Sequence, residues 1–283
     1  MKKIFYFVFI STIISCGTDN SNIKIPSESK IVVEGWIDVG DVPQVILSRS
    51  VPISTIITRD NALNYVIRSA KITVSDGVQN EVLSLSSNNN GRIPPYVYRG
   101  NTIIGQEGKT YNLKIEYLNR VVTASTTIPQ TVAIQSVAYI KTNPADVTGF
   151  AHISFNDPIN QKNYYQISTR EAQKDSIFVP AFYGNLNDSD FASSTVSLKI
   201  NKGISVYPNA NFEPYFSDNK TVFIKLRTMN KDAFDFWNSW QNEIVNGQNP
   251  IFPSSTSLIS NINGGVGLWA GYGQSTSTLQ TIP

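Results

Sequence analysis

The chain has 283 residues, of which 41% are hydrophobic and 11% aromatic, a composition typical of a folded globular protein rather than a disordered one. The formal net charge of +2 argues against nucleic-acid binding through a basic face. A single histidine and a single cysteine provide no set of side chains for a zinc site or a disulfide.

The first fifteen residues predict an export signal. Lys2 and Lys3 precede a mostly apolar run over residues 4–14, which are the charged start and short hydrophobic region of a signal peptide. The run is too short to cross a bilayer, because a spanning helix needs about 20 apolar residues. Without Lys2 and Lys3, the 21 remaining basic residues balance the 21 acidic ones.

Cys16 directly follows this signal and is the predicted site of lipid attachment. Residues 13–16 read IISC, which resembles the bacterial lipobox, where the thiol accepts a diacylglycerol before cleavage and acylation of the new amine. Two or more acyl chains such as palmitate hold a protein stably in a bilayer. The alternative interpretation is an ordinary secretory signal in which the cysteine is incidental.

A polar stretch follows, and then a first β domain. Residues 16–30 are mostly small and polar, which predicts a flexible tether. Residues 31–130 contain about seven short strands, and the predicted ones span residues 31–37, 44–48, 70–75, 81–85, 95–98, 111–117 and 121–127. Turn residues separate them, which favours an antiparallel sandwich with immunoglobulin-like or transthyretin-like topology.

A second β-rich domain is expected over residues 131–283. Its predicted strands span residues 132–139, 151–155, 164–169, 196–200, 221–227 and 266–270, with a polar loop over 184–194 and an irregular segment over 211–219.

One amphipathic helix is predicted near residues 231–245. Asn230 can cap it, and one face carries Phe234, Trp237, Trp240 and Ile244 at spacings of three and four. We expect this face to cover an open sheet, and the alternative is a helix that binds a partner.

The order of these segments resembles a known family. After the lipobox come IVVEGWI, PQVILSRS, SAKITVSDG, GQEGKTYNLKIEY and ASTTIP, and later SNINGGVGLWAGYG. This order is similar to that of Bacteroidota outer-membrane lipoproteins of unknown function, whose genes commonly neighbour TonB-dependent receptors. The resemblance covers nearly the whole chain and implies a place in the outer membrane beside such a receptor. Residues 92–95 depart from it, because a more uniform strand is expected there.

Few residues suggest chemistry. His152 is expected to point outward from its strand, so a catalytic triad through it is disfavoured. The Asn185–Asp190 segment offers oxygen ligands for calcium through Asn185, Asn187, Asp188 and Asp190, but its spacing differs from that of an EF-hand. A pair of catalytic carboxylates remains an open alternative. Tyr96, Tyr98, Phe182 and Tyr183 are candidate binding aromatics, although core positions are favoured for most of them.

The sequence therefore predicts a non-enzymatic accessory protein of a TonB-dependent receptor, held in the outer membrane by lipid on Cys16, without cofactor or metal. It would bind or present substrate, or gate the receptor. The alternative is an envelope assembly or adhesion protein that binds another protein, and an envelope hydrolase is the least favoured hypothesis.

Overall fold

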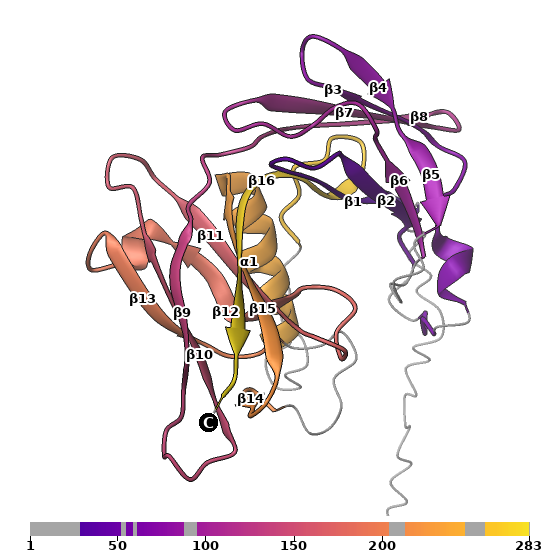
Figure 1. Cartoon of the computed structure of the whole chain (residues 1–283). Coiled ribbons are helices and arrows are strands. Elements are labelled where there is room, and N and C mark those ends of the chain that lie inside the picture. The colour runs from indigo at the N-terminus through magenta and orange to yellow at the C-terminus, as the bar shows by residue number, and fades with distance from the viewer. Residues whose placement is uncertain are drawn as a thin grey trace, which may run out of the picture.

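The computed structural model describes residues 29–51, 55–58, 61–87, 95–203, 213–246 and 258–282. The predicted signal peptide, Cys16 and nearly all of the tether lie outside these residues. The described chain is mainly β with one α-helix, which confirms the predicted fold class. Figure 1 shows two β-rich parts side by side.

The first part holds β1 (Ile31–Asp38), β2 (Gln44–Arg49), the short 3-10 helix η1 (Ala62–Tyr65), β3 (Lys71–Ser75), β4 (Asn80–Val82), β5 (Ser84–Ser87), β6 (Tyr96–Arg99), β7 (Thr110–Tyr117) and β8 (Arg120–Thr127). The second part holds β9 (Ile134–Ile140), β10 (Thr148–Asn156), β11 (Tyr164–Glu171), β12 (Val179–Asn187), the 3-10 helix η2 (Asp188–Asp190), β13 (Thr195–Ile200), β14 (Phe216–Ser217), β15 (Thr221–Met229) and α1 (Lys231–Asn246). The strand β16 (Val266–Gln280) comes last.

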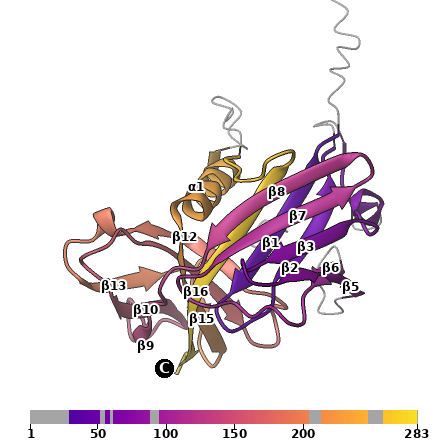
Figure 2. The same ribbon diagram turned by 90° about the horizontal axis from the view of Figure 1, so that it is seen from above.

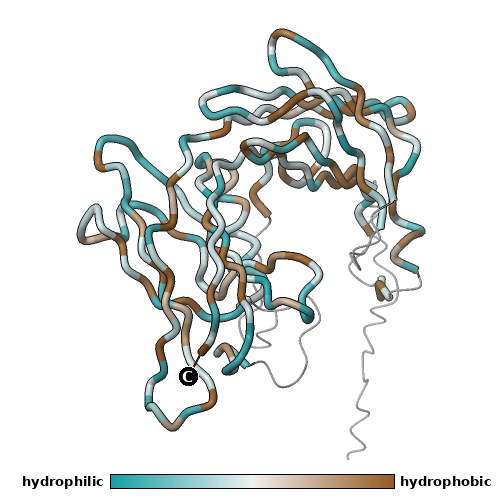
Figure 3. The backbone as a smooth tube through the Cα atoms, in the orientation of Figure 1, coloured by the Kyte–Doolittle hydropathy of each residue, from teal (hydrophilic) through white to brown (hydrophobic). Residues whose placement is uncertain are grey.

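The first core lies between two sheets. The sheet of β4-β3-β7-β8 packs on the β1-β2-β6-β5 portion of an eight-stranded sheet. The predicted alternation is confirmed, because Ile72 and Val74 are fully buried while Lys71 is exposed, and Figure 3 shows hydrophobic and hydrophilic segments alternating along the tube. The single strand predicted over residues 81–85 is instead β4 and β5, because the chain changes sheets at the buried Leu83.

The second core lies between the sheet in which β9, β13 and β14 all pair with β10 and the β11-β15 region of the eight-stranded sheet. Ala151, Ile153 and Phe155 point into it from β10, as predicted. The alternating Val222, Ile224 and Leu226 of β15 are fully buried on the opposite side. Period-two burial on both layers is what two packed sheets require.

The strand β16 joins the two cores. Its first half pairs in parallel with β1, from Val266 opposite Val32 to Tyr272 opposite Asp38. Its second half pairs antiparallel with β15, ending with Gln280 opposite Thr221. The eight-stranded sheet, ordered β12-β11-β15-β16-β1-β2-β6-β5, therefore runs through both parts (Figure 2). The domain boundary near residue 130 stays a prediction. The last strand nevertheless contributes the fully buried Trp269 to the first core.

This strand is fifteen residues long, whereas residues 266–270 were predicted. Glycine weakens an isolated strand, but here it permits close contact between backbones. Gly267 has φ +123, and a Cβ on it would lie 1.9 Å from the Val33 carbonyl oxygen. A Cβ on Gly271 would lie 2.8 Å from Cγ1 of Ile128. The predicted strand was too short because glycines were interpreted as turn residues. Here they instead allow close packing against neighbouring chain.

The helix α1 covers the sheet where the two parts meet. The Asn230 side chain accepts from the backbone N–H of Ala233 at 3.0 Å, which confirms the predicted cap. Phe234 and Trp237 pack with Ala233 and Phe236 against residues of β1, β11, β15 and β16, namely Trp36, Tyr164, Met229, Leu268, Ala270 and Tyr272. Trp240 packs edge-on against Trp237, and the side chain of Ile244 lies outside the description. No helix among the described residues is long and apolar enough to span a bilayer.

Two predicted irregular segments were wrong. The first four residues of the expected polar loop at 184–194 belong to β12, because Asn185 and Asn187 pair with Gln166 and Tyr164 of β11. Its polar side chains suggested a loop, but in the structure the Asn185 amide donates hydrogen bonds to α1. Within the second segment, Phe216 is buried and pairs with Gly149 in the short strand β14; residues 211 and 212 lie outside the description.

Replacement of Gly267 tests the close contact between β16 and β1. We expect Gly267→Ala to lower the free energy of unfolding by about 3 kcal/mol, because the new Cβ would clash with the Val33 carbonyl. Gly77→Ala is the matched control, since Gly77 also has positive φ (+87) but open space around it, and should cost about 1 kcal/mol. Urea unfolding of both variants measures this difference. Equal losses would contradict the proposed packing.

Candidate functional site

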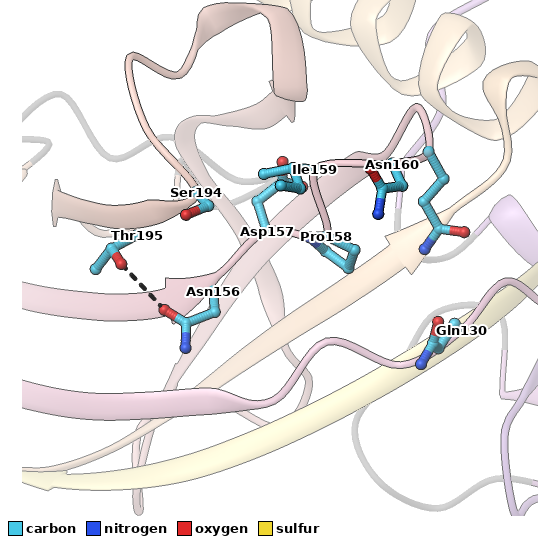
Figure 4. Close-up of a pocket in the computed structure, with 9 residues that line it drawn as sticks. Gln130, Asn156, Asp157, Pro158, Ile159, Asn160, Ser194 and Thr195 are labelled. Atoms are coloured by element: carbon cyan, nitrogen blue, oxygen red, sulfur yellow. Dashed lines mark hydrogen bonds between the residues drawn. The ribbon is translucent and has the colours of Figure 1, made fainter.

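An open cavity of about 580 Å³ lies in the second part (Figure 4). It is bounded by the end of β10, the connection to β11, the start of β13 and the segment that joins the two parts. Six of its nine lining residues carry an amide or hydroxyl side chain, and the lining comprises Gln130, Asn156, Asp157, Pro158, Ile159, Asn160, Gln161, Ser194 and Thr195. Groups of this kind donate and accept hydrogen bonds without carrying charge.

Two hydrogen bonds hold one wall of the cavity to the strand opposite. The backbone N–H of Asp157 donates to the Ser194 carbonyl at 2.7 Å, and the Thr195 hydroxyl donates to the Asn156 side chain at 3.3 Å (Figure 4). The predicted turn at residues 156–158 lies later in the chain, because Asn156 still belongs to β10 and the turn residues are Ile159 and Asn160. This arrangement fixes the positions of the polar groups around the opening.

Asp157, the one titratable group among the described residues of the lining, is buried and bound by the protein itself. The Tyr165 hydroxyl donates to its carboxylate, and the Asn163 amide donates to the same oxygen at 3.2 Å. Two effects raise the pKa of the Tyr165 hydroxyl well above its ordinary value: mainly its burial, and to a smaller extent its interaction with the Asp157 carboxylate. Tyr165 therefore stays a protonated donor at neutral pH, and Asp157 acts as a structural acceptor in the cavity wall.

The Asn163 side chain organises the loop that carries most of the cavity. Its amide nitrogen also lies 3.1 Å from the carbonyls of Pro158 and Gln161. One buried amide thus contacts three points of the loop, which helps to hold its conformation. The opening therefore presents several neutral side chains that can donate and accept hydrogen bonds.

His152 lies apart from this cavity lining. It points away from the second core, as predicted, and its Nε2 lies 3.3 Å from the Ser197 hydroxyl on β13. This places a neutral hydroxyl beside the ring, on the outer surface of a sheet.

The oxygens considered for calcium have separate protein partners. The side-chain oxygen of Asn185 accepts from the Gln166 amide at 3.1 Å, and its amide nitrogen donates to the Trp237 carbonyl on α1 at 3.1 Å. Asn187 and Asp190 form the reciprocal capping box of η2, while Asp188 accepts from the Asn163 backbone N–H at 3.1 Å. Among the residues that the structure describes, no group of three or more His, Cys, Asp or Glu side chains is placed to hold a metal ion.

The candidate binding aromatics separate into core and surface positions. Tyr98 is a core residue, since it is 3% exposed and its hydroxyl donates to the Ile67 carbonyl. Tyr96 is half-buried beneath the Arg68 guanidinium. Tyr183 is 61% exposed with φ +56, in an interruption of the β11–β12 pairing, and its ring packs on that of Phe182. An exposed aromatic at a sheet edge suits contact with another molecule.

An ion pair between the two parts had no signal in the sequence. Arg227 of β15 donates to Asp38 of β1 at 2.9 Å, and both side chains are largely buried. The guanidinium lies 4.3 Å from the centre of the Tyr272 ring, and burial raises the pKa of Tyr272 to about 12. Burial also lowers the pKa of the neighbouring Lys225. Pattern reasoning missed the pair because its members are far apart in the chain.

Removal of the Tyr165 hydroxyl tests the structure of the cavity wall. We expect Tyr165→Phe to lower the free energy of unfolding by about 2 kcal/mol, because the buried Asp157 carboxylate loses a donor. The control Tyr183→Phe removes an exposed hydroxyl and should change it by less than about 0.5 kcal/mol. Denaturant unfolding measures both variants, and an effect at Tyr165 no larger than at Tyr183 would contradict the described hydrogen bond.

Comparison with known proteins identifies a family. A search of curated proteins gave no match. One similar solved structure is a two fibronectin type-III domain segment from chicken tenascin, which is 8% identical and covers 71% of this chain and 91% of that chain. Its TM-score of 0.21 is too low to support any inference. Residues 18–278 match the family described as "Domain of unknown function (DUF4249)", and the chain therefore belongs to this family.

Proposed function

We propose that this chain is a lipid-anchored, non-enzymatic protein of the outer membrane that holds substrate for a TonB-dependent receptor. The observation that carries the proposal is the lipobox, in which Cys16 is the only cysteine of the chain. An acylated cysteine at this position would keep the folded body beside membrane proteins. The receptor as partner follows from the resemblance of the segment order described above.

The amide and hydroxyl side chains around the cavity support a binding role. Its amides and hydroxyls suit a neutral ligand that hydrogen-bonds at several points. Asp157 is held by Tyr165 and Asn163, so its carboxylate serves the wall of the cavity. Acid–base catalysis needs a group that is free to exchange protons with the substrate. Because Asp157 is occupied in the wall, we favour a binding role for the cavity over a catalytic one.

A second candidate function is contact with another envelope protein in assembly or adhesion. Tyr183 favours it, because an exposed tyrosine at a sheet edge offers a rigid apolar surface with a polar tip. In this alternative the partner would be a protein other than a receptor, and no small ligand would be held.

Affinity purification from detergent-solubilised membranes distinguishes the two functions. We expect a TonB-dependent receptor barrel to co-purify with the wild-type protein, and mass spectrometry to find an acylated Cys16 at the mature amino terminus. The control variant Cys16→Ala should appear in the soluble fraction after a high-salt wash, since it lacks the acyl chains.

A different envelope protein in place of the barrel would favour the assembly function. An unmodified thiol on Cys16, or a Cys16→Ala variant that stays in the membrane after the wash, would contradict the lipid anchor.

A further inference from the structure

The tether enters the folded body at one end of the first part. Ser29, the first described residue, donates through its hydroxyl to the Ser50 carbonyl at 3.0 Å, and its own carbonyl accepts from the Arg120 side chain. It therefore lies between the end of β2 and the turn that joins β7 to β8. Figures 1 and 2 both place that turn at the edge of the molecule away from β9, β10 and β13.

Exposed aliphatic side chains surround this entry point. The Arg49 guanidinium at the end of β2 donates to the Asn64 carbonyl of η1 at 2.8 Å, and the Asn61 amide donates to the Ile56 carbonyl at 2.9 Å. The exposed fractions are 85% for Leu118, 79% for Ile56, 57% for Ile57 and 40% for Leu63. Together with the adjoining cations Lys30, Arg49, Arg68 and Arg120, these side chains are called the tethered end below.

Leu118 occupies a position that neither its backbone nor its burial favours. It is the first of two residues between Tyr117 and Arg120, which pair across the hairpin, and its φ is +52. Gly, Asn and Asp are the usual residues at such turn positions. A leucine that is both conformationally strained and exposed to solvent indicates that the side chain has a use outside the fold.

The charge of the tethered end complements an anionic surface. Its four cations are all exposed. The nearby Glu116 is already paired with Lys71 and Lys114, at 3.7 and 3.0 Å. Aliphatic side chains flanked by lysine and arginine are the combination by which peripheral proteins bind anionic lipid.

The tether is short enough to bring this end to the membrane. Ser29 stands thirteen positions after Cys16. A flexible chain of this length has a root-mean-square span of about 20 Å and a fully extended limit of about 45 Å. With Cys16 in the bilayer, the tethered end would be the part of the body closest to lipid for much of the time, so that even a weak contact would be populated.

We propose that the tethered end lies against the membrane, with Leu118 and Ile56 entering the boundary between headgroups and acyl chains and the cations binding anionic lipid. This inference rests on the proposed acylation of Cys16 for its orientation. The contact points the opposite end of the first part, which carries the turn after Gly77, away from the bilayer.

A fluorescent probe at the turn tests this orientation. The acylated protein is placed in phosphatidylcholine vesicles that contain roughly one third phosphatidylglycerol. Because Cys16 is consumed by lipid, Leu118→Cys provides the only thiol for an environment-sensitive fluorophore. The control Val78→Cys lies at the far turn after Gly77 and is 89% exposed. We expect brominated lipid to quench the probe at residue 118 and not at residue 78. Equal quenching, or quenching at residue 78 alone, would overturn the proposal.

The unacylated Cys16→Ala chain tests the contact without the anchor, so that its outcome is independent of whether Cys16 is acylated. We expect it to sediment with the same vesicles in low salt and less with pure phosphatidylcholine. Lys30→Ala should weaken binding roughly fivefold. Leu118→Asn should weaken it about tenfold while preserving the fold, since asparagine tolerates positive φ. Unchanged binding of the Leu118→Asn variant would contradict the contact even if mass spectrometry confirmed the lipid.

Discussion

The pairing of β16 with both β1 and β15 is the constraint on which the rest of the structure depends. A strand shared by two sandwiches makes each core incomplete without the end of the chain. Trp269 shows this directly, because it fills the first core from a strand that follows every other element of the second. Its indole N–H donates to the Tyr111 carbonyl at 2.9 Å. The first part therefore needs residues that are more than a hundred positions away from its other strands.

Apolar and ionic contacts on one face of the sheet also join the two parts, and they contribute unequally to stability. The packing of α1 on β16 buries aromatic surface, and the Trp237 indole donates to the Tyr272 hydroxyl at 2.8 Å. The Asp38–Arg227 pair is also buried, but desolvation of two charges offsets much of their attraction. We therefore assign the stability of the junction mainly to the helix, and to the ion pair the role of fixing how the two parts are oriented. The shared sheet thus connects the cavity-bearing second part to the tethered first part.

Local patterns in the sequence predicted the elements well and their partners poorly. Strict alternation marked β3, β7 and β15 because each has one buried face. The cap of α1 was equally local. The full length of β16 was missed because its glycines resemble a loop, and β12 because its polar side chains find partners on a helix that lies far along the chain. The loop at Asn156–Asp157 was predicted as a turn, but its role as a cavity wall depends on Asn163 and Tyr165, which no local pattern connects to it.

Calorimetric unfolding of the mature chain tests most directly the claim that one strand makes the two parts a single body. If β16 and α1 join the cores as described, the protein should unfold in one transition whose calorimetric and van't Hoff enthalpies agree. Two resolved transitions, with each part melting at its own temperature, would contradict the account.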